Sequence, residues 1–173
     1  MVHSIELTLD TAADGAVRDL WQALAEGGVP SQAGHRSPTN RPHVTVTVAA
    51  RMSAGVDAGL APLLDRLPLR CRIGAPMFFG RGPYTLVLLV IPSVELLDLH
   101  AQVHRICLPH MDPEPLRHTL PGQWTPHVTL ARRIGADLLE RALTVVGTGA
   151  DIEGEFAGLR HWDGDVRQER PIS

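Results

Sequence analysis

The spacing of apolar residues divides the first half of the chain into short alternating elements. Val2–Asp10 carries an apolar residue at every second position, which is typical of a strand with one buried face. The following residues repeat apolar side chains at i, i+3, i+4 and i+7, which predicts an amphipathic helix. The inner face of that helix carries Val17, Leu20, Trp21 and Leu24. Asp10 or Thr11 can cap its start, and Gly27–Gly28 ends it because glycine adopts the left-handed C-terminal conformation without strain.

The remainder of the first half continues the alternation. After a polar loop, the β-branched run His43–Val48 predicts a second strand. The leucine spacing over residues 56–67 predicts a short helix that Pro62 delays or kinks. Alternation over Leu69–Ile73 predicts a third strand, and Gly80–Pro83 predicts a turn or linker.

The second half repeats this order. Tyr84–Ile91 predicts a buried strand, and Ser93 can cap a helix that runs to about Cys107. A proline-rich loop then leads to elements predicted over His127–Leu130 (strand), Ala136–Val146 (helix) and Asp151–His161 (strand). Each half is therefore predicted as β-α-β-α-β, so the chain carries an internal duplication that combines helices with sheets. The direction of the strands stays open at this point.

One tetrapeptide opens the middle strand of both halves. Pro-His-Val-Thr, followed by an aliphatic residue, begins at Pro42 and again at Pro126. Residues i and i+2 of a strand point to the same side, so His43 shares a face with Thr45, and His127 with Thr129. The opposite face, which we expect in the core, carries Val44, Val46, Val48, Val128 and Leu130. Two such strands related by a pseudo-twofold axis bring two imidazoles and two hydroxyls to one cleft.

This set of groups suits phosphoryl transfer without a metal or cofactor. One neutral imidazole can take a proton from the attacking oxygen while the other, protonated, gives one to the leaving oxygen. Histidine populates both forms near neutral pH, and threonine hydroxyls can donate to the non-bridging phosphate oxygens. A single His-x-Thr carries little information, whereas its recurrence on matching strands favours a functional role.

The stretches Arg41–Val46 and Thr125–Arg132 resemble the paired signatures of the 2H phosphoesterases, most closely the bacterial 2′-5′ RNA ligase or RNA 2′,3′-cyclic phosphodiesterase group. The resemblance implies an α+β fold with largely antiparallel sheets around a central cleft. It implies a single domain over residues 1–173, with pseudo-symmetric lobes of about 1–80 and 84–173. His43 and His127 are then the catalytic residues, and the expected substrate-binding residues are Thr45, Thr129 and Arg132.

The position of the arginine leaves two candidates. Strict alternation places Arg132 on the side away from His127, whereas Arg133 has the same parity as His127. A bulge near the strand end would re-aim the side chains. The resemblance favours Arg132, and Arg133 stays open.

The resulting hypothesis is a metal-independent phosphodiesterase that opens 2′,3′-cyclic phosphates at RNA ends to 2′-phosphates. The same site with a 5′-hydroxyl as nucleophile would form a 2′-5′ linkage. Two alternatives stay open: action on a small nucleotide, such as an ADP-ribose cyclic phosphate or 2′-5′ oligoadenylate, and a non-catalytic nucleotide- or RNA-binding protein of the same fold. The expected partners are RNA termini or small cyclic nucleotide phosphates, and we expect a monomer.

Composition limits the setting of this chemistry. The 173 residues include 16 basic side chains, all of them arginine, against 19 acidic ones, so the net charge is −3. This balance does not favour a broad basic surface for a long nucleic acid. The longest apolar stretch, Leu86–Ile91, is too short to span a bilayer. Only Cys71 and Cys107 are present, and the start of the chain lacks a signal-peptide pattern, so we expect a cytoplasmic protein with reduced thiols.

Other side chains have weaker claims on function. His100 and His104 stand at i, i+4 on a predicted helix and could bind zinc with a third ligand such as His110, but a partly exposed helix face explains the pair more simply. Arg36 and Arg41 can meet a phosphate or be solvated. The candidate base-stacking residues are Phe79, Tyr84, Trp124 and Trp162.

Overall fold

The computed structural model describes residues 2–112, 114–147 and 151–173. The first half forms β1 (His3–Leu9), α1 (Thr11–Glu26), β2 (His43–Ala49), β3 (Arg51–Met52), α2 (Val56–Leu60) and β4 (Leu69–Phe79). The second half forms β5 (Tyr84–Val90), α3 (Val94–Cys107), β6 (Met111–Asp112), β7 (His127–Ile134), α4 (Leu139–Val146), β8 (Ile152–Asp163) and β9 (Gln168–Pro171). The predicted order of strands and helices in each half is therefore confirmed, with the short strands β3, β6 and β9 added.

The main sheet is antiparallel throughout its described strand pairs. Its strands lie in the order β1-β2-β7-β5-β4-β8-β9, and β1 also pairs with β8. Six of these strands therefore form a closed ring, and β9 extends it beside β8. The ring has its fewest residue pairs between β2 and β7, which are joined only by the pairing of Val44 with Val128 in the described strands. The antiparallel sheet implied by the family resemblance is confirmed.

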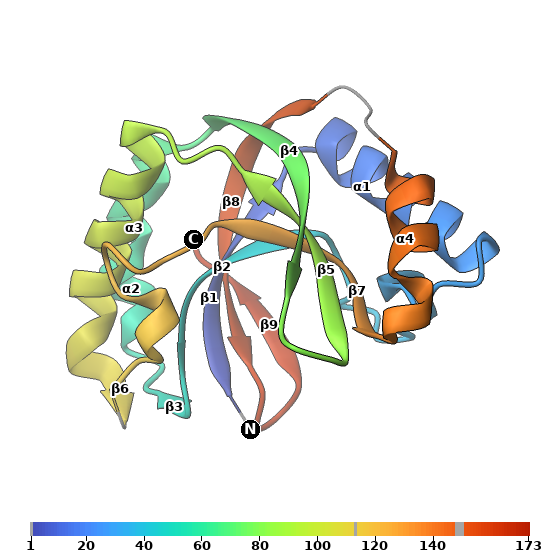
Figure 1. Cartoon of the computed structure of the whole chain (residues 1–173). Coiled ribbons are helices and arrows are strands. Elements are labelled where there is room, and N and C mark those ends of the chain that lie inside the picture. The colour runs from blue at the N-terminus through green and yellow to red at the C-terminus, as the bar shows by residue number, and fades with distance from the viewer. Residues whose placement is uncertain (1, 113, 148–150) are drawn as a thin grey trace.

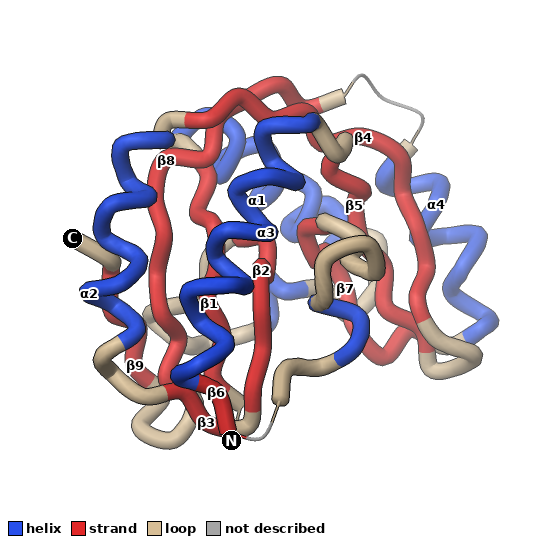
Figure 2. Tube along the Cα trace, turned by 90° about the vertical axis from the view of Figure 1, so that its left-hand side faces the viewer, coloured by secondary structure: helices blue, strands red, loops and turns tan. Residues whose placement is uncertain are grey.

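Each side of the molecule contains elements from both halves of the sequence. Helix α1 contacts α4, and α2 contacts α3, so the two helix pairs flank the strands on opposite sides (Figure 1). Turning the molecule by 90° brings the α2–α3 pair in front of the sheet (Figure 2). The strands mix in the same way, because β1 from the first half pairs with β8, and β4 pairs with both β5 and β8.

The predicted apolar faces and helix caps form as expected. Val17, Trp21 and Leu24 of α1 are buried against the strands. The Asp10 side chain accepts hydrogen bonds from the backbone N–H groups of Ala12 and Ala13, and Ser93 caps α3 in the same manner. The helix predicted over residues 56–67 is interrupted, since α2 passes into a 3-10 helix, Ala61–Arg66, that has proline in its first turn. No helix in the described ranges is both long and apolar enough to cross a membrane.

Two expectations about strand faces were wrong. Val48 was expected in the core, but it lies at a cavity. The reason is a bulge in β2, which has one extra residue opposite the Ile5–Glu6 step of β1. Thr47 takes the buried position instead. The polar face of β1 was expected to be exposed, yet Ser4 and Glu6 are each only 5% exposed because that face forms the wall of the same cavity.

Candidate active site

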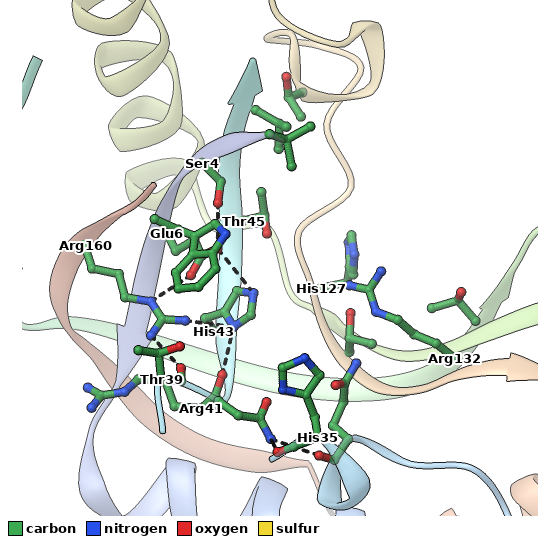
Figure 3. Close-up of a pocket in the computed structure, with 18 of the residues that line it drawn as sticks. Ser4, Glu6, His35, Thr39, Arg41, His43, Thr45, His127, Arg132 and Arg160 are labelled. Carbon is green, nitrogen blue, oxygen red and sulfur yellow. Dashed lines mark hydrogen bonds and ion pairs between the residues drawn. The ribbon is translucent and has the colours of Figure 1, made fainter. Parts of the chain in front are cut away.

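A cavity of about 790 Å³ lies where β2 and β7 meet. Its lining includes His43 and Thr45 from β2 and His127 and Thr129 from β7. Because Val44 pairs with Val128 in an antiparallel sense, His43 lies toward Thr129 and Thr45 toward His127. The fold thus brings the four residues of the repeated motif to one place, with the two rings on neighbouring strands (Figure 3).

Both histidine rings are fixed by the same short hydrogen bond. Nδ1 of His43 lies 2.8 Å from the carbonyl oxygen of Arg41, and Nδ1 of His127 lies 2.7 Å from that of Thr125. A carbonyl oxygen can only accept, so Nδ1 carries a proton in each ring. The neutral tautomer therefore leaves Nε2 unprotonated, which makes this nitrogen of each ring the group available for proton transfer.

Two tryptophans anchor the motif strands. The indole N–H of Trp21 donates to the carbonyl oxygen of Thr129 at 3.0 Å, and that of Trp124 donates to the carbonyl oxygen of Thr45 at 2.9 Å. Each motif threonine is thus held through its backbone by a tryptophan from outside its own strand. Trp124, a candidate for base stacking, serves here as an anchor.

His100 supports this anchor and does not lie on an exposed face. Its ring stacks on Trp124 with centroids 4.0 Å apart, and its Nε2 donates to the carbonyl oxygen of Thr119 at 3.0 Å. The side chain is buried, with 2% exposure, so the expectation of a partly exposed helix face was wrong for this residue. His104, one turn further along α3, is half-buried.

The sequence did not reveal a buried ion pair beside His43. Glu6 accepts hydrogen bonds from Nε of Arg160 and from the hydroxyl of Ser4, both at 2.7 Å. One Glu6 oxygen lies 3.6 Å from Nε2 of His43. Burial raises the pKa of Glu6, but the charges of His43 and Arg160 outweigh it, and the pKa is lowered overall. Glu6 is therefore ionised in a cavity that otherwise suits an anion.

His127 has different surroundings. Burial lowers its pKa, and the positive charges of Arg132, His43 and His118 lower it further, against the hydrogen bond to Thr125, which raises it. The ring of Phe79 packs edge-on against it with centroids 4.9 Å apart. The neutral form of His127 is thus favoured at neutral pH, which suits a proton acceptor.

Arg132, and not Arg133, lies at the cavity. Leu130 and Ala131 are both buried, and the pairing of β7 with β5 shifts at this point, so a bulge reverses the alternation. Arg132 then lines the cavity on the His127 side (Figure 3). Arg133 is exposed and takes a φ of 59°.

The remaining candidates divide between the cavity and the rest of the molecule. Arg41 and Trp162 line the cavity, as does Phe79. Tyr84 packs against the core and meets Phe78 edge-on. Arg36 is exposed and is not among the lining residues. Glu6 of β1 and Arg160 of β8 were not predicted as site residues. Only the knowledge that the polar faces of these strands line a cavity would have indicated them.

Comparison with known proteins agrees with the family resemblance of the two motifs. The model of the 2′-5′ RNA ligase superfamily matches residues 9–166. TT0787 of Thermus thermophilus superimposes with a TM-score of 0.60 at 14% identity, covering 100% of this chain and 96% of that one. E. coli LigT complexed with 3′-AMP superimposes with a TM-score of 0.56 at 16% identity, covering 100% of this chain and 96% of that one. Kluyveromyces marxianus Usb1 with uridine monophosphate superimposes with a TM-score of 0.56 at 13% identity, covering 99% of this chain and 97% of that one. No curated protein matches the chain in sequence.

Proposed function

The chain belongs to the 2′-5′ RNA ligase superfamily of 2H phosphoesterases, and we propose that it is a metal-independent phosphodiesterase that hydrolyses RNA 2′,3′-cyclic phosphate ends to 2′-phosphates. Structures of the same fold contain 3′-AMP in E. coli LigT and uridine monophosphate in Usb1, which supports a nucleotide as the ligand class. The two free thiols, Cys71 and Cys107, are consistent with a reducing, cytoplasmic setting.

The proposed reaction divides its two proton transfers between the two rings. Nε2 of neutral His127 takes a proton from water, whose oxygen attacks the phosphorus atom. As the new P–O bond forms, the bond from phosphorus to the ribose 3′-oxygen breaks, and Nε2–H of protonated His43 gives its proton to that oxygen. The product is a 2′-phosphate with a free 3′-hydroxyl. Replacing water with a 5′-hydroxyl would yield the 2′-5′ linkage by the same transfers.

The developing charge on the phosphate falls among donors that line the cavity. The hydroxyls of Thr45 and Thr129 and the guanidinium of Arg132 can donate to the non-bridging oxygens. One observation carries the proposal: both imidazoles have Nδ1 bound to a backbone carbonyl and share a single cavity. A site that only bound phosphate would not require two titrating groups on adjacent strands.

Product analysis tests this function. The protein is incubated with an RNA oligonucleotide ending in a 2′,3′-cyclic phosphate, a mononucleotide 2′,3′-cyclic phosphate and 2′-5′ oligoadenylate, and the products are separated by chromatography. We expect a 2′-phosphate from the first two substrates, formed at a strongly reduced rate by His127→Ala. Turnover of 2′-5′ oligoadenylate alone would assign the small-nucleotide alternative, and binding without turnover of any substrate would assign the non-catalytic one.

A further inference from the structure

We propose that Glu6, held by Ser4 and Arg160, is a positioning residue that keeps His43 in its protonated form and thereby makes it the general acid. The inference rests on the proposed function and adds to it a residue outside the repeated motif. Glu6 acts through His43 and does not touch the reacting atoms. The geometry of the carboxylate, the charges around it and the duplication of the fold each support it.

The Glu6 carboxylate is fixed at both oxygens. Oε2 accepts from Nε of Arg160 at 2.7 Å, while Oε1 accepts from the Ser4 hydroxyl at 2.7 Å and lies 3.6 Å from Nε2 of His43. The side chain is only 6% exposed, so little water screens it. One oxygen is thus held close to the nitrogen that exchanges the proton.

A carboxylate in this place opposes the binding of a phosphate. Two negative groups in one low-dielectric cavity repel each other, so Glu6 is not explained as a substrate ligand. Besides the Ser4 hydroxyl, its charged partner is Arg160, whose guanidinium is shared with Glu169. When protonated, His43 is the second cation available to Glu6.

The charged and titratable groups around His43 come from β1, from β8, from the loop before β2 and from β7, whose His127 interacts with it electrostatically. Glu6 faces it from β1, and Arg160 faces it from β8 with Nη2 at 3.4 Å from Nδ1. The loop before β2 contributes the Arg41 carbonyl, while the Arg41 side chain lies 3.7 Å from Glu169. The two carboxylates offset the two arginines of this cluster. At 3.6 Å the Glu6 oxygen lies beyond hydrogen-bond distance of Nε2 of His43, so Glu6 acts on this ring through its charge and leaves Nε2–H free for the leaving oxygen.

The second half of the duplicated fold has no carboxylate at the position that matches Glu6. In the first half, Glu6 of β1 lies opposite Thr45 of β2. At the matching position of the second half, Val87 of β5 lies opposite Thr129 of β7. At this register position the second half therefore carries an aliphatic residue where the first half carries a carboxylate. The duplication repeats the imidazoles and hydroxyls but places one negative charge beside only one of them, which separates the roles of the two rings.

Substitution of Glu6 by glutamine tests the role without requiring turnover. The Cε1–H signals of both rings are followed by NMR from pH 5 to 9 in the free protein and assigned with single histidine variants. In Glu6→Gln, the titration midpoint of the His43 ring should fall by at least one unit, a tenfold loss of proton affinity, while that of His127 changes far less. Glu169→Gln is the matched control, since Glu169 contacts Arg160 but not His43.

Kinetics distinguish this role from a structural one. With a mononucleotide 2′,3′-cyclic phosphate, Glu6→Gln should lower kcat about tenfold or more at pH 8, with little loss at pH 6, and should not raise KM because it removes a charge that repels phosphate. Glu6→Asp, which keeps the charge, should recover part of the rate. A rise in KM with unchanged kcat would overturn the proposal.

A wild-type measurement covers the case in which Glu6→Gln does not fold. The carboxyl carbon of Glu6 should show a chemical-shift step at the pH at which the His43 ring titrates. Absence of that step, or an unchanged His43 midpoint in a folded Glu6→Gln, contradicts the proposal. If the titrations behave as expected but no cyclic phosphate is hydrolysed, the proposed function fails while the Glu6–His43 coupling stands.

Discussion

The two indole anchors allow a direct test of how the fold holds the motif strands. Trp21→Phe and Trp124→Phe each keep an aromatic ring and delete the N–H that donates to the carbonyl of Thr129 or Thr45. These bonds, at 3.0 and 2.9 Å, have the ordinary length of a well-formed N–H···O hydrogen bond. A partly buried carbonyl left without its donor costs about 1–3 kcal/mol.

This cost converts to a measurable change in thermal stability. A chain of this size loses about 2–4 °C of Tm per kcal/mol, so each variant should melt about 2–12 °C below the wild type. The threonine and histidine of each motif are two residues apart on the released strand, and small misplacements of catalytic groups can cost up to about 100-fold in rate. We therefore expect kcat/KM to fall together with Tm, measured by circular dichroism melts and by hydrolysis of a cyclic nucleotide.

The third tryptophan supplies the control. Trp162 also lines the cavity but lies on β8, and the indole bonds to the two motif carbonyls come from Trp21 and Trp124. Trp162→Phe should change the free energy of unfolding by no more than about 0.5 kcal/mol, as expected outside packed anchors. If Trp21→Phe and Trp124→Phe melt like Trp162→Phe and keep full activity, the indole bonds do not hold the motif strands.

Four further predictions concern the reaction, the two catalytic rings, pH and the first helix cap. Incubation with EDTA should leave kcat unchanged, and recovery of lost activity by a divalent ion would contradict the metal-independent reaction. His43→Ala and His127→Ala should each lower kcat by about 10²–10⁴, with the double variant little below the worse single one, as steady-state kinetics would show. Burial lowers the pKa of His100 and His161, so below about pH 6.5 the unfolded chain binds more protons than the folded one. The free energy of unfolding should therefore fall as the pH drops below that value. Equal urea midpoints at pH 7.5 and 5.5 would argue against this. Asp10→Ala should cost about 1 kcal/mol in urea unfolding by removing the cap of α1, and an unchanged midpoint would rule out a stabilising cap.

Periodicity alone was sufficient for the order of elements and for placing the histidine and threonine of each motif on one face. A strand pattern of period two places His43 with Thr45 and His127 with Thr129 whatever the tertiary structure, and the caps Asp10 and Ser93 depend only on local hydrogen bonds. These features could be predicted because each is determined by a few neighbouring residues.

Features that depend on pairing between distant strands could not be predicted in this way. Glu6 stands on the polar face of β1, and a sequence pattern assigns such a face to solvent unless the strands around it are known. The bulges that move Val48 and Arg132 to the cavity reverse the alternation, which had placed Val48 in the core and favoured Arg133, whereas the family resemblance favoured Arg132. The contacts of Trp21 and Trp124 join residues far apart in sequence, and no local signal indicates them.

The single residue pair between β2 and β7 has a mechanical consequence. Every other neighbouring pair in the ring of strands is joined by several residue pairs, so Val44 and Val128 form the point about which the two walls of the cavity can turn most easily. In a rotation, displacement grows with distance from the axis, and His43 and His127 each stand next to this pair in sequence. Opening the mouth for a bulkier nucleotide would thus move the outer lining far more than it would change the separation of the two imidazoles.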